Sequence, residues 1–187
     1  MAPSYKRILA VKQADLGDLL AVTPALQALR EAHPEARIDL LVPPSSASLL
    51  EGAPFLDRII SYDKYRFDSL RGLLSPLYVL SALRLLLRLR LERYDALAIF
   101  HHFTTRWGGL KFQALALATG APVRAGLDNG RGDFLTLHAL DRGFGARHEV
   151  EYWLAVAGLL GADAGAGWRP SIPISEEDRA EADRLLQ

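Results

Sequence analysis

The 187-residue chain contains no cysteine. Disulfide bonds and thiolate metal sites are therefore excluded, and the composition fits a reducing compartment. The N-terminus also lacks the apolar segment and the small-residue cleavage site of a secretory signal peptide. These features lead us to expect a cytoplasmic protein.

An excess of charge of one sign and long hydrophobic runs are also missing. The 22 Lys and Arg residues balance 22 Asp and Glu residues, so no bulk electrostatic field favours nucleic acid as a partner. No uninterrupted apolar run reaches the ~20 residues that a membrane-spanning helix needs. Because half of the residues are hydrophobic, the chain can still bury one core of ordinary domain size.

The N-terminal segment shows the most regular pattern in the chain. Ile8 to Val11 form an apolar run, which is typical of a strand buried on both faces of a parallel sheet. Residues 12–17 are polar and end in glycine, which favours a tight turn into a helix. Asp18 follows at the helix start, where a carboxylate can accept hydrogen bonds from free backbone N–H groups. It can equally border a ligand crevice, because ligands of open parallel sheets bind at the carboxyl ends of strands.

Strand and helix patterns alternate along the rest of the chain. We expect further strands at residues 37–42, 58–62, 95–100, 122–126 and 134–140. Helical patterns occupy residues 47–50, 70–93, 110–118 and 147–160. This alternation predicts an α/β fold with a Rossmann-like, doubly wound and mostly parallel sheet.

The sequence VKQADLGD at residues 11–18, followed by TPAL at 23–26, resembles the opening of glycosyltransferase family 9. That family includes the heptosyltransferases of lipopolysaccharide core synthesis. The resemblance continues through residues 38–42, 57–60, 94–95 and 119–126. It covers nearly the whole chain but only the N-terminal half of such an enzyme. It implies a GT-B architecture, in which two Rossmann-like domains face each other across a cleft.

The resemblance also implies a function. The Asp of the family's Gly-Asp pair acts as catalytic base in inverting transfer, and this position corresponds to Asp18. The chain would then be the acceptor-binding half of an enzyme that moves a sugar from a nucleotide-sugar donor to a glycan or lipid-linked acceptor. The family holds the donor mainly in its C-terminal domain, so we expect no cofactor here and no activity of this chain alone.

Several side chains are candidates for acceptor binding. The loop after strand 95–100 should border the same crevice as Asp18, where it could form a hydrogen-bonding wall for a sugar. Neighbouring histidines on an extended chain point to opposite sides, and no carboxylate is close in sequence, so we expect no metal site. Arginines further along could meet an anionic acceptor. The candidates are Lys12, Gln13, Gly17, His101, His102, Thr105, Arg106, Arg124 and Arg131.

The segment 161–167 is rich in glycine and alanine and indicates a boundary. We expect residues 1–168 to form the acceptor-side domain. Residues 169–187 should form a crossing segment and the start of a C-terminal domain.

Residues 70–93 have a leucine-rich circumference wider than one sheet contact covers. They predict either a core helix with a solvated arginine stripe or a basic surface element that docks on a partner or on the inner face of a membrane.

Two non-enzymatic functions stay open. The chain could be a stand-alone module that binds a sugar or headgroup without catalysis, or a structural partner covered by a C-terminal domain or another chain. A nucleotide-binding Rossmann protein is disfavoured, because the first loop has one glycine in place of a spaced triplet.

Overall fold

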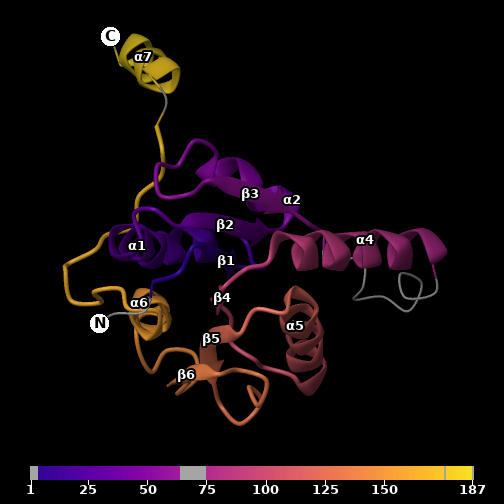
Figure 1. The fold of residues 1–187 in the computed structure, drawn as a ribbon. Helices are drawn as coiled ribbons and strands as arrows, with labels where there is room; N and C mark the ends of the chain where they lie inside the picture. Colours follow the sequence, from indigo (N-terminus) through magenta and orange to yellow (C-terminus); the bar gives the residue numbers. More distant parts are fainter. Residues whose placement is uncertain (1–3, 64–74, 175, 187) are drawn as a thin grey trace.

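The structure is a computed structural model that describes residues 4–63, 75–174 and 176–186. Within these residues, six parallel strands form a sheet in the order β3-β2-β1-β4-β5-β6 (Figure 1). The strands are β1 (Arg7–Val11), β2 (Arg37–Val42), β3 (Arg58–Ser61), β4 (Ala96–Ile99), β5 (Val123–Asp128) and β6 (Leu137–Leu140). The predicted Rossmann-like α/β fold is therefore confirmed.

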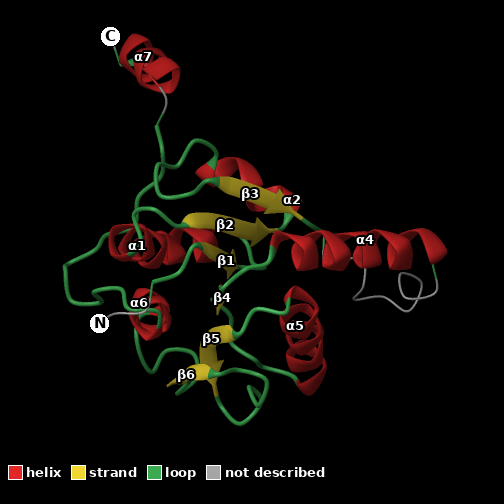
Figure 2. Cartoon of the chain, in the orientation of Figure 1, coloured by secondary structure: helices red, strands yellow, loops and turns green. Residues whose placement is uncertain are grey.

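Helices cover both faces of this sheet (Figure 2). The helices of the described residues are α1 (Leu16–Ala32), α2 (Pro44–Ala47), η1 (Ser48–Leu50), α4 (Pro76–Glu92), α5 (Arg106–Thr119), α6 (Glu149–Leu159) and α7 (Glu176–Leu185). Of these, α1 and α6 pack on one face and α4 and α5 on the other. The core that includes α1 and α6 takes Ile8 and Ala10 of β1, whereas the core on the α4 and α5 face takes Leu9 and Val11. Burial on both faces explains why β1 is a continuous apolar run.

Helix α1 continues through Pro24, although proline has no N–H for the carbonyl one turn earlier. The Thr23 hydroxyl donates to that carbonyl, on Leu20, at 2.9 Å. Its oxygen also accepts from the Ser171 N–H at 3.0 Å, which fixes the extended segment after α6 against α1. The next helix, α7, has no buried residue and lies away from the sheet (Figure 1).

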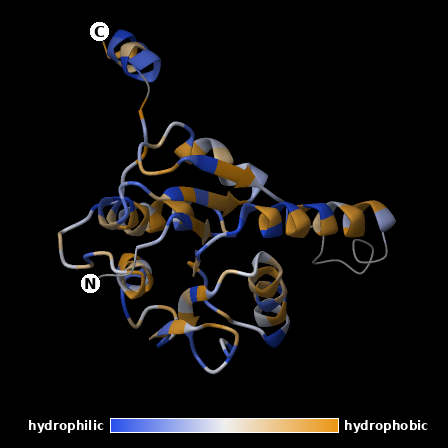
Figure 3. Ribbon diagram, in the orientation of Figure 1, coloured by the Kyte–Doolittle hydropathy of each residue, from blue (hydrophilic) through white to orange (hydrophobic). Residues whose placement is uncertain are grey.

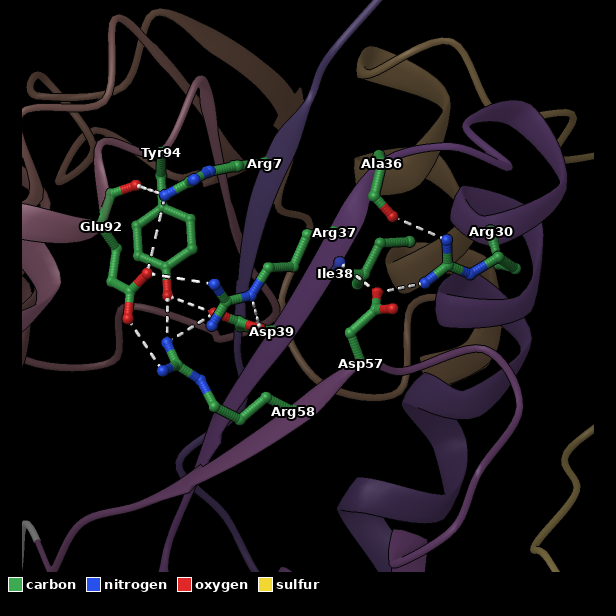
Figure 4. A network of polar contacts seen from close by, with 10 residues as sticks. All are labelled: Arg7, Arg30, Ala36, Arg37, Ile38, Asp39, Asp57, Arg58, Glu92 and Tyr94. Atoms are coloured by element: carbon green, nitrogen blue, oxygen red, sulfur yellow. Dashed lines mark hydrogen bonds and ion pairs between the residues drawn. The ribbon is translucent and has the colours of Figure 1, made fainter.

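A buried carboxylate lies near the amino-terminal ends of β2 and β3 (Figure 4). Asp39 is fully buried and accepts from the Tyr94 hydroxyl at 2.6 Å, Arg58 Nη2 at 2.7 Å and Arg37 Nε at 3.1 Å. Burial raises the pKa of the Tyr94 hydroxyl, and its bond to Asp39 raises that pKa further. Glu92, the last residue of α4, contacts Arg58 Nη1 at 2.8 Å. This network ties the end of α4 to the sheet.

Gly120 ends α5 in the left-handed region, with φ of +67°, and a Cβ added there would lie 1.2 Å from Arg90 Nη1. We expect Gly120→Ala to lower the free energy of unfolding, measured in urea, by about 2 kcal/mol. Gly52 has a similar φ of +77° but open space around its Cβ position, so Gly52→Ala measures the backbone cost alone. Equal losses in the two variants would show that the contact with Arg90 contributes nothing.

Candidate functional site

The order of the strands reverses between β1 and β4, which are neighbours in the sheet. Their following loops leave the carboxyl edge together, since the Phe100 N–H donates to the Val11 carbonyl at 2.9 Å. The loop after β1 is held on its other side by the Lys12 N–H, which donates to the Leu41 carbonyl at 3.1 Å. Such a reversal point is where open α/β sheets bind their ligands.

Asp18 lies in the first turn of α1, directly after the β1 loop, and is exposed. Within the described part of the chain, no hydrogen bond or ion pair engages its carboxylate. Gly17 beside it is also exposed, and nothing lies within 4 Å of the place where a Cβ would be. A ligand hydroxyl can therefore reach the Asp18 carboxylate.

His102 is buried between two carboxylates that the sequence analysis did not connect with it. Its Nδ1 lies 3.0 Å from Asp141 Oδ1, and its Nε2 lies 3.3 Å from Glu149 Oε2. The rings of Tyr152 and Trp153 enclose it at centroid distances of 5.0 and 5.1 Å. His102 thus joins the β4 loop to the residue after β6 and to the start of α6.

His101 points to the other side of the chain, as expected for neighbours on an extended segment. Its ring packs on Phe112 of α5 at a centroid distance of 4.6 Å. It also lines a cavity of about 510 Å³ between α4 and α5, together with the buried Gln13 of the β1 loop. Leu85, Leu86 and other apolar side chains form most of the remaining wall. The cavity therefore connects the carboxyl edge of the sheet with these helices.

Lys12 is buried, with Nζ 4.2 Å from the centroid of the Trp153 ring, in a cation–π contact. Trp153 is the same ring that encloses His102, so the loops after β1 and β4 share one support on α6. Lys12 is therefore buried against α6 and not exposed at the carboxyl edge of the sheet.

The loop after β5 is organised by Asp128. Its Oδ1 accepts from the backbone N–H groups of Gly130 at 2.8 Å, Arg131 at 3.1 Å and Gly132 at 2.8 Å. Burial alone would raise the pKa of Asp128, but these three bonds hold it below the usual value. The loop places Arg131 Nη1 3.2 Å from Asn129 Oδ1 and near the Phe103 carbonyl of the β4 loop. Arg131 therefore lies at the same edge as His101 and His102.

The other candidates differ in position. Thr105 caps α5 by accepting from the Gly108 N–H at 2.9 Å, and Arg106 is exposed in the first turn of that helix. Arg124 lies near the amino end of β5, where Nε donates to the Phe134 carbonyl at 2.6 Å and Nη1 to the Ala121 carbonyl at 3.0 Å. The structure does not bring Arg124 to the crevice.

Sequence reasoning missed Asp141 and Glu149 as partners of His102. No local spacing connects them, because they come from the end of β6 and the start of α6. The available signal was topological, since the carboxyl ends of parallel strands share one edge.

Among residues 4–63, 75–174 and 176–186, no group of three or more His, Asp or Glu side chains is arranged to hold a metal ion. No helix in these ranges is long and apolar enough to cross a membrane.

Comparisons with known proteins relate this geometry to a family. No sequence-family model matches the chain. A putative glycosyltransferase from Haemophilus influenzae is 36% identical over 55 residues, which cover 29% of this chain and 16% of that protein. A solved glycosyl transferase family 9 structure from Veillonella parvula is 26% identical and superimposes with a TM-score of 0.71 over 100% of this chain and 50% of that one. The resemblance to glycosyltransferase family 9 is confirmed.

Two Escherichia coli structures share the fold of this family 9-like chain. ADP-heptose lipopolysaccharide heptosyltransferase II is 19% identical with a TM-score of 0.68, over 97% of this chain and 50% of that one. Heptosyltransferase WaaC with ADP is 20% identical with a TM-score of 0.66, over 94% of this chain and 52% of that one. The chain thus spans about half the length of the solved structures that it matches.

Proposed function

We propose that this chain is the acceptor-binding half of an inverting glycosyltransferase, and that Asp18 is its catalytic base. The proposal is carried by one observation. Asp18 presents an exposed carboxylate without a partner among the described residues, at the reversal point of a family 9-like sheet. The backbone that carries Asp18 is rigid, because the start of a helix after a buried strand holds the side chain in one place.

In the proposed reaction, Asp18 takes the proton of an acceptor hydroxyl while that oxygen attacks the anomeric carbon of the donor sugar. The nucleoside diphosphate leaves from the opposite face, so the configuration at that carbon inverts. A base must lie within hydrogen-bond reach of the proton that it removes. Because Asp18 is exposed, an acceptor oxygen can approach its carboxylate to this distance.

The proposed acceptor is an anionic glycan or lipid-linked glycan. Arg106 and Arg131 are exposed cations at the same edge as the β4 loop, and guanidinium groups bind phosphate and carboxylate in a bidentate manner. Gln13 and His101 add polar groups to the lining of the cavity between α4 and α5. We propose that the nucleotide-sugar donor binds mainly through a second domain, and that residues 1–168 form the acceptor-side domain.

Binding measurements test whether this chain holds the acceptor and not the donor. We expect calorimetric titration of the chain with deacylated lipopolysaccharide core oligosaccharide to show binding that Arg106→Gln and Arg131→Gln each weaken about tenfold, the usual scale for a charged hydrogen bond. Arg179→Gln on the distant α7 should leave it unchanged. A panel of nucleoside-diphosphate sugars should bind more weakly than about 1 mM. A micromolar dissociation constant for any of these sugars would reveal a donor site within this chain and contradict the proposal.

A further inference from the structure

Helix α4 has two apolar faces, whereas a helix that packs on a sheet needs one. The inward face carries the buried Leu89, and Leu85 and Leu86 line the cavity against α5. The outward face carries a set of leucines spaced three or four residues apart, so they share one side of the helix. We call Leu77, Leu80, Leu83, Leu87 and Leu91 the leucine stripe; their exposed fractions lie between 42% and 75%.

The leucine stripe runs along a helix that extends beyond the body of the domain. Figure 3 shows hydrophobic residues along the whole length of α4. In Figure 2, α4 continues past the edge of the sheet toward which the arrowheads of β2 and β3 point. This is the carboxyl edge, where Asp18 also lies. Exposed Trp107 and Leu110 of the neighbouring α5 enlarge the apolar surface.

Cations border this surface, although the chain as a whole is neutral. Arg84 and Arg88 follow Leu83 and Leu87 along one edge of the stripe, and both are exposed. Across α4 and α5 the cationic side chains are Arg84, Arg88, Arg90, Arg106 and Lys111. The carboxylate of these two helices, Glu92, is already held by Arg37 and Arg58. The exposed surface of the two helices is thus apolar and locally basic.

We propose that α4 docks on an anionic lipid bilayer through the leucine stripe. The stripe enters the boundary between headgroups and acyl chains, while Arg84 and Arg88 extend along their aliphatic stems to the headgroup phosphates. Anionic lipids supply negative charges for Arg84 and Arg88. The inference goes beyond sugar transfer and stands on α4 and α5 even if Asp18 is not the base.

A bilayer fits this surface better than a protein partner does. The centre of a protein interface is depleted of charge, and leucine is rarely among its dominant anchors. Here guanidinium groups flank the leucines along the helix, so a partner protein would have to supply a carboxylate beside each apolar pocket. A lipid surface offers phosphates along the full length of the stripe without such a match.

Co-sedimentation of the full chain with vesicles tests the proposal. We expect binding to vesicles of phosphatidylcholine mixed with phosphatidylglycerol, little binding to phosphatidylcholine alone, and release as salt rises. The pair Arg84→Glu, Arg88→Glu should weaken binding at least about tenfold. The pair Leu83→Gln, Leu87→Gln should do the same, because the exposed leucines supply the apolar contact. Circular dichroism should show unchanged helix content, since all four side chains are exposed.

The matched control is Arg179→Glu, Arg184→Glu on α7, which changes the net charge equally on a helix away from α4 (Figure 1). It should retain vesicle binding. The proposal is overturned by absent binding, by equal binding to neutral vesicles, or by a loss in the α7 control as large as in the α4 pair. It is also overturned if the chain forms a dimer that Leu83→Gln, Leu87→Gln dissociates without any vesicle binding by the parent chain.

Discussion

Asp18→Asn is expected to lower the turnover of sugar transfer by about 10² or more, measured in a protein that joins this domain to a donor-binding domain. Asparagine keeps the shape of the side chain but cannot take the proton of the acceptor hydroxyl. The Michaelis constant for the acceptor should therefore change little. Folding should be intact, because Asp18 is exposed and no other described side chain depends on it.

Asp15→Asn provides the control in the same loop. Asp15 is exposed and stands at the N-cap of α1 without a side-chain capping bond, so the substitution removes the same charge from the same edge. Both variants should unfold within ~0.5 kcal/mol of the parent chain, and Asp15→Asn should keep its turnover. Near-normal turnover of Asp18→Asn would instead reduce Asp18 to a helix-start residue and favour a non-catalytic binding module.

The sheet could be predicted from sequence because burial on both faces leaves a direct signal. Residues 37–42 were expected as a strand and form β2 with the same bounds. The last strand was predicted to begin at residue 134 but begins at Leu137. Phe134 is apolar for another reason, since it packs in the core under α4 and α5 beside a turn in which the Leu135 N–H donates to the Gly132 carbonyl. Apolar character alone does not separate a strand from such a turn.

Only the part of the candidate site that follows from the order and direction of the strands could be predicted from the sequence. Residues after β1 and β4 meet because parallel strands end at one edge, and the same rule places Arg131 there. The partners of His102 depend on how α6 packs, which no spacing in the sequence records. The region 70–93 left a core helix and a surface element as alternatives. Within its described part, α4 buries only Leu89, which favours the surface element.

The largest loss of stability is expected on substitution of Asp39, which is not part of the candidate functional site. Its fully buried carboxylate accepts bonds from Tyr94, Arg58 and Arg37, and removing its charge leaves two guanidinium groups without their buried partner. Breaking a buried ion pair from one side typically costs several kcal/mol. We expect Asp39→Asn to lower the free energy of unfolding in urea by about 3 kcal/mol, the lower end of that range because both arginines are partly exposed.

Asp57→Asn is the matched comparison for Asp39→Asn, and both residues appear in Figure 4. Asp57 pairs with Arg30 and accepts from the Ile38 N–H at 2.7 Å, but its side chain is 45% exposed. Water therefore screens that ion pair, and an amide oxygen can still accept the backbone bond, so the loss should stay below about 1 kcal/mol. The loss in the free energy of unfolding for Tyr94→Phe should lie between these two values, because the substitution removes one hydrogen bond to Asp39 and leaves the charges in place. Equal losses of stability for Asp39→Asn and Asp57→Asn would show that water solvates Arg37 and Arg58 as readily as it solvates Arg30. The buried carboxylate of Asp39 would then not be what holds the end of α4 to the sheet.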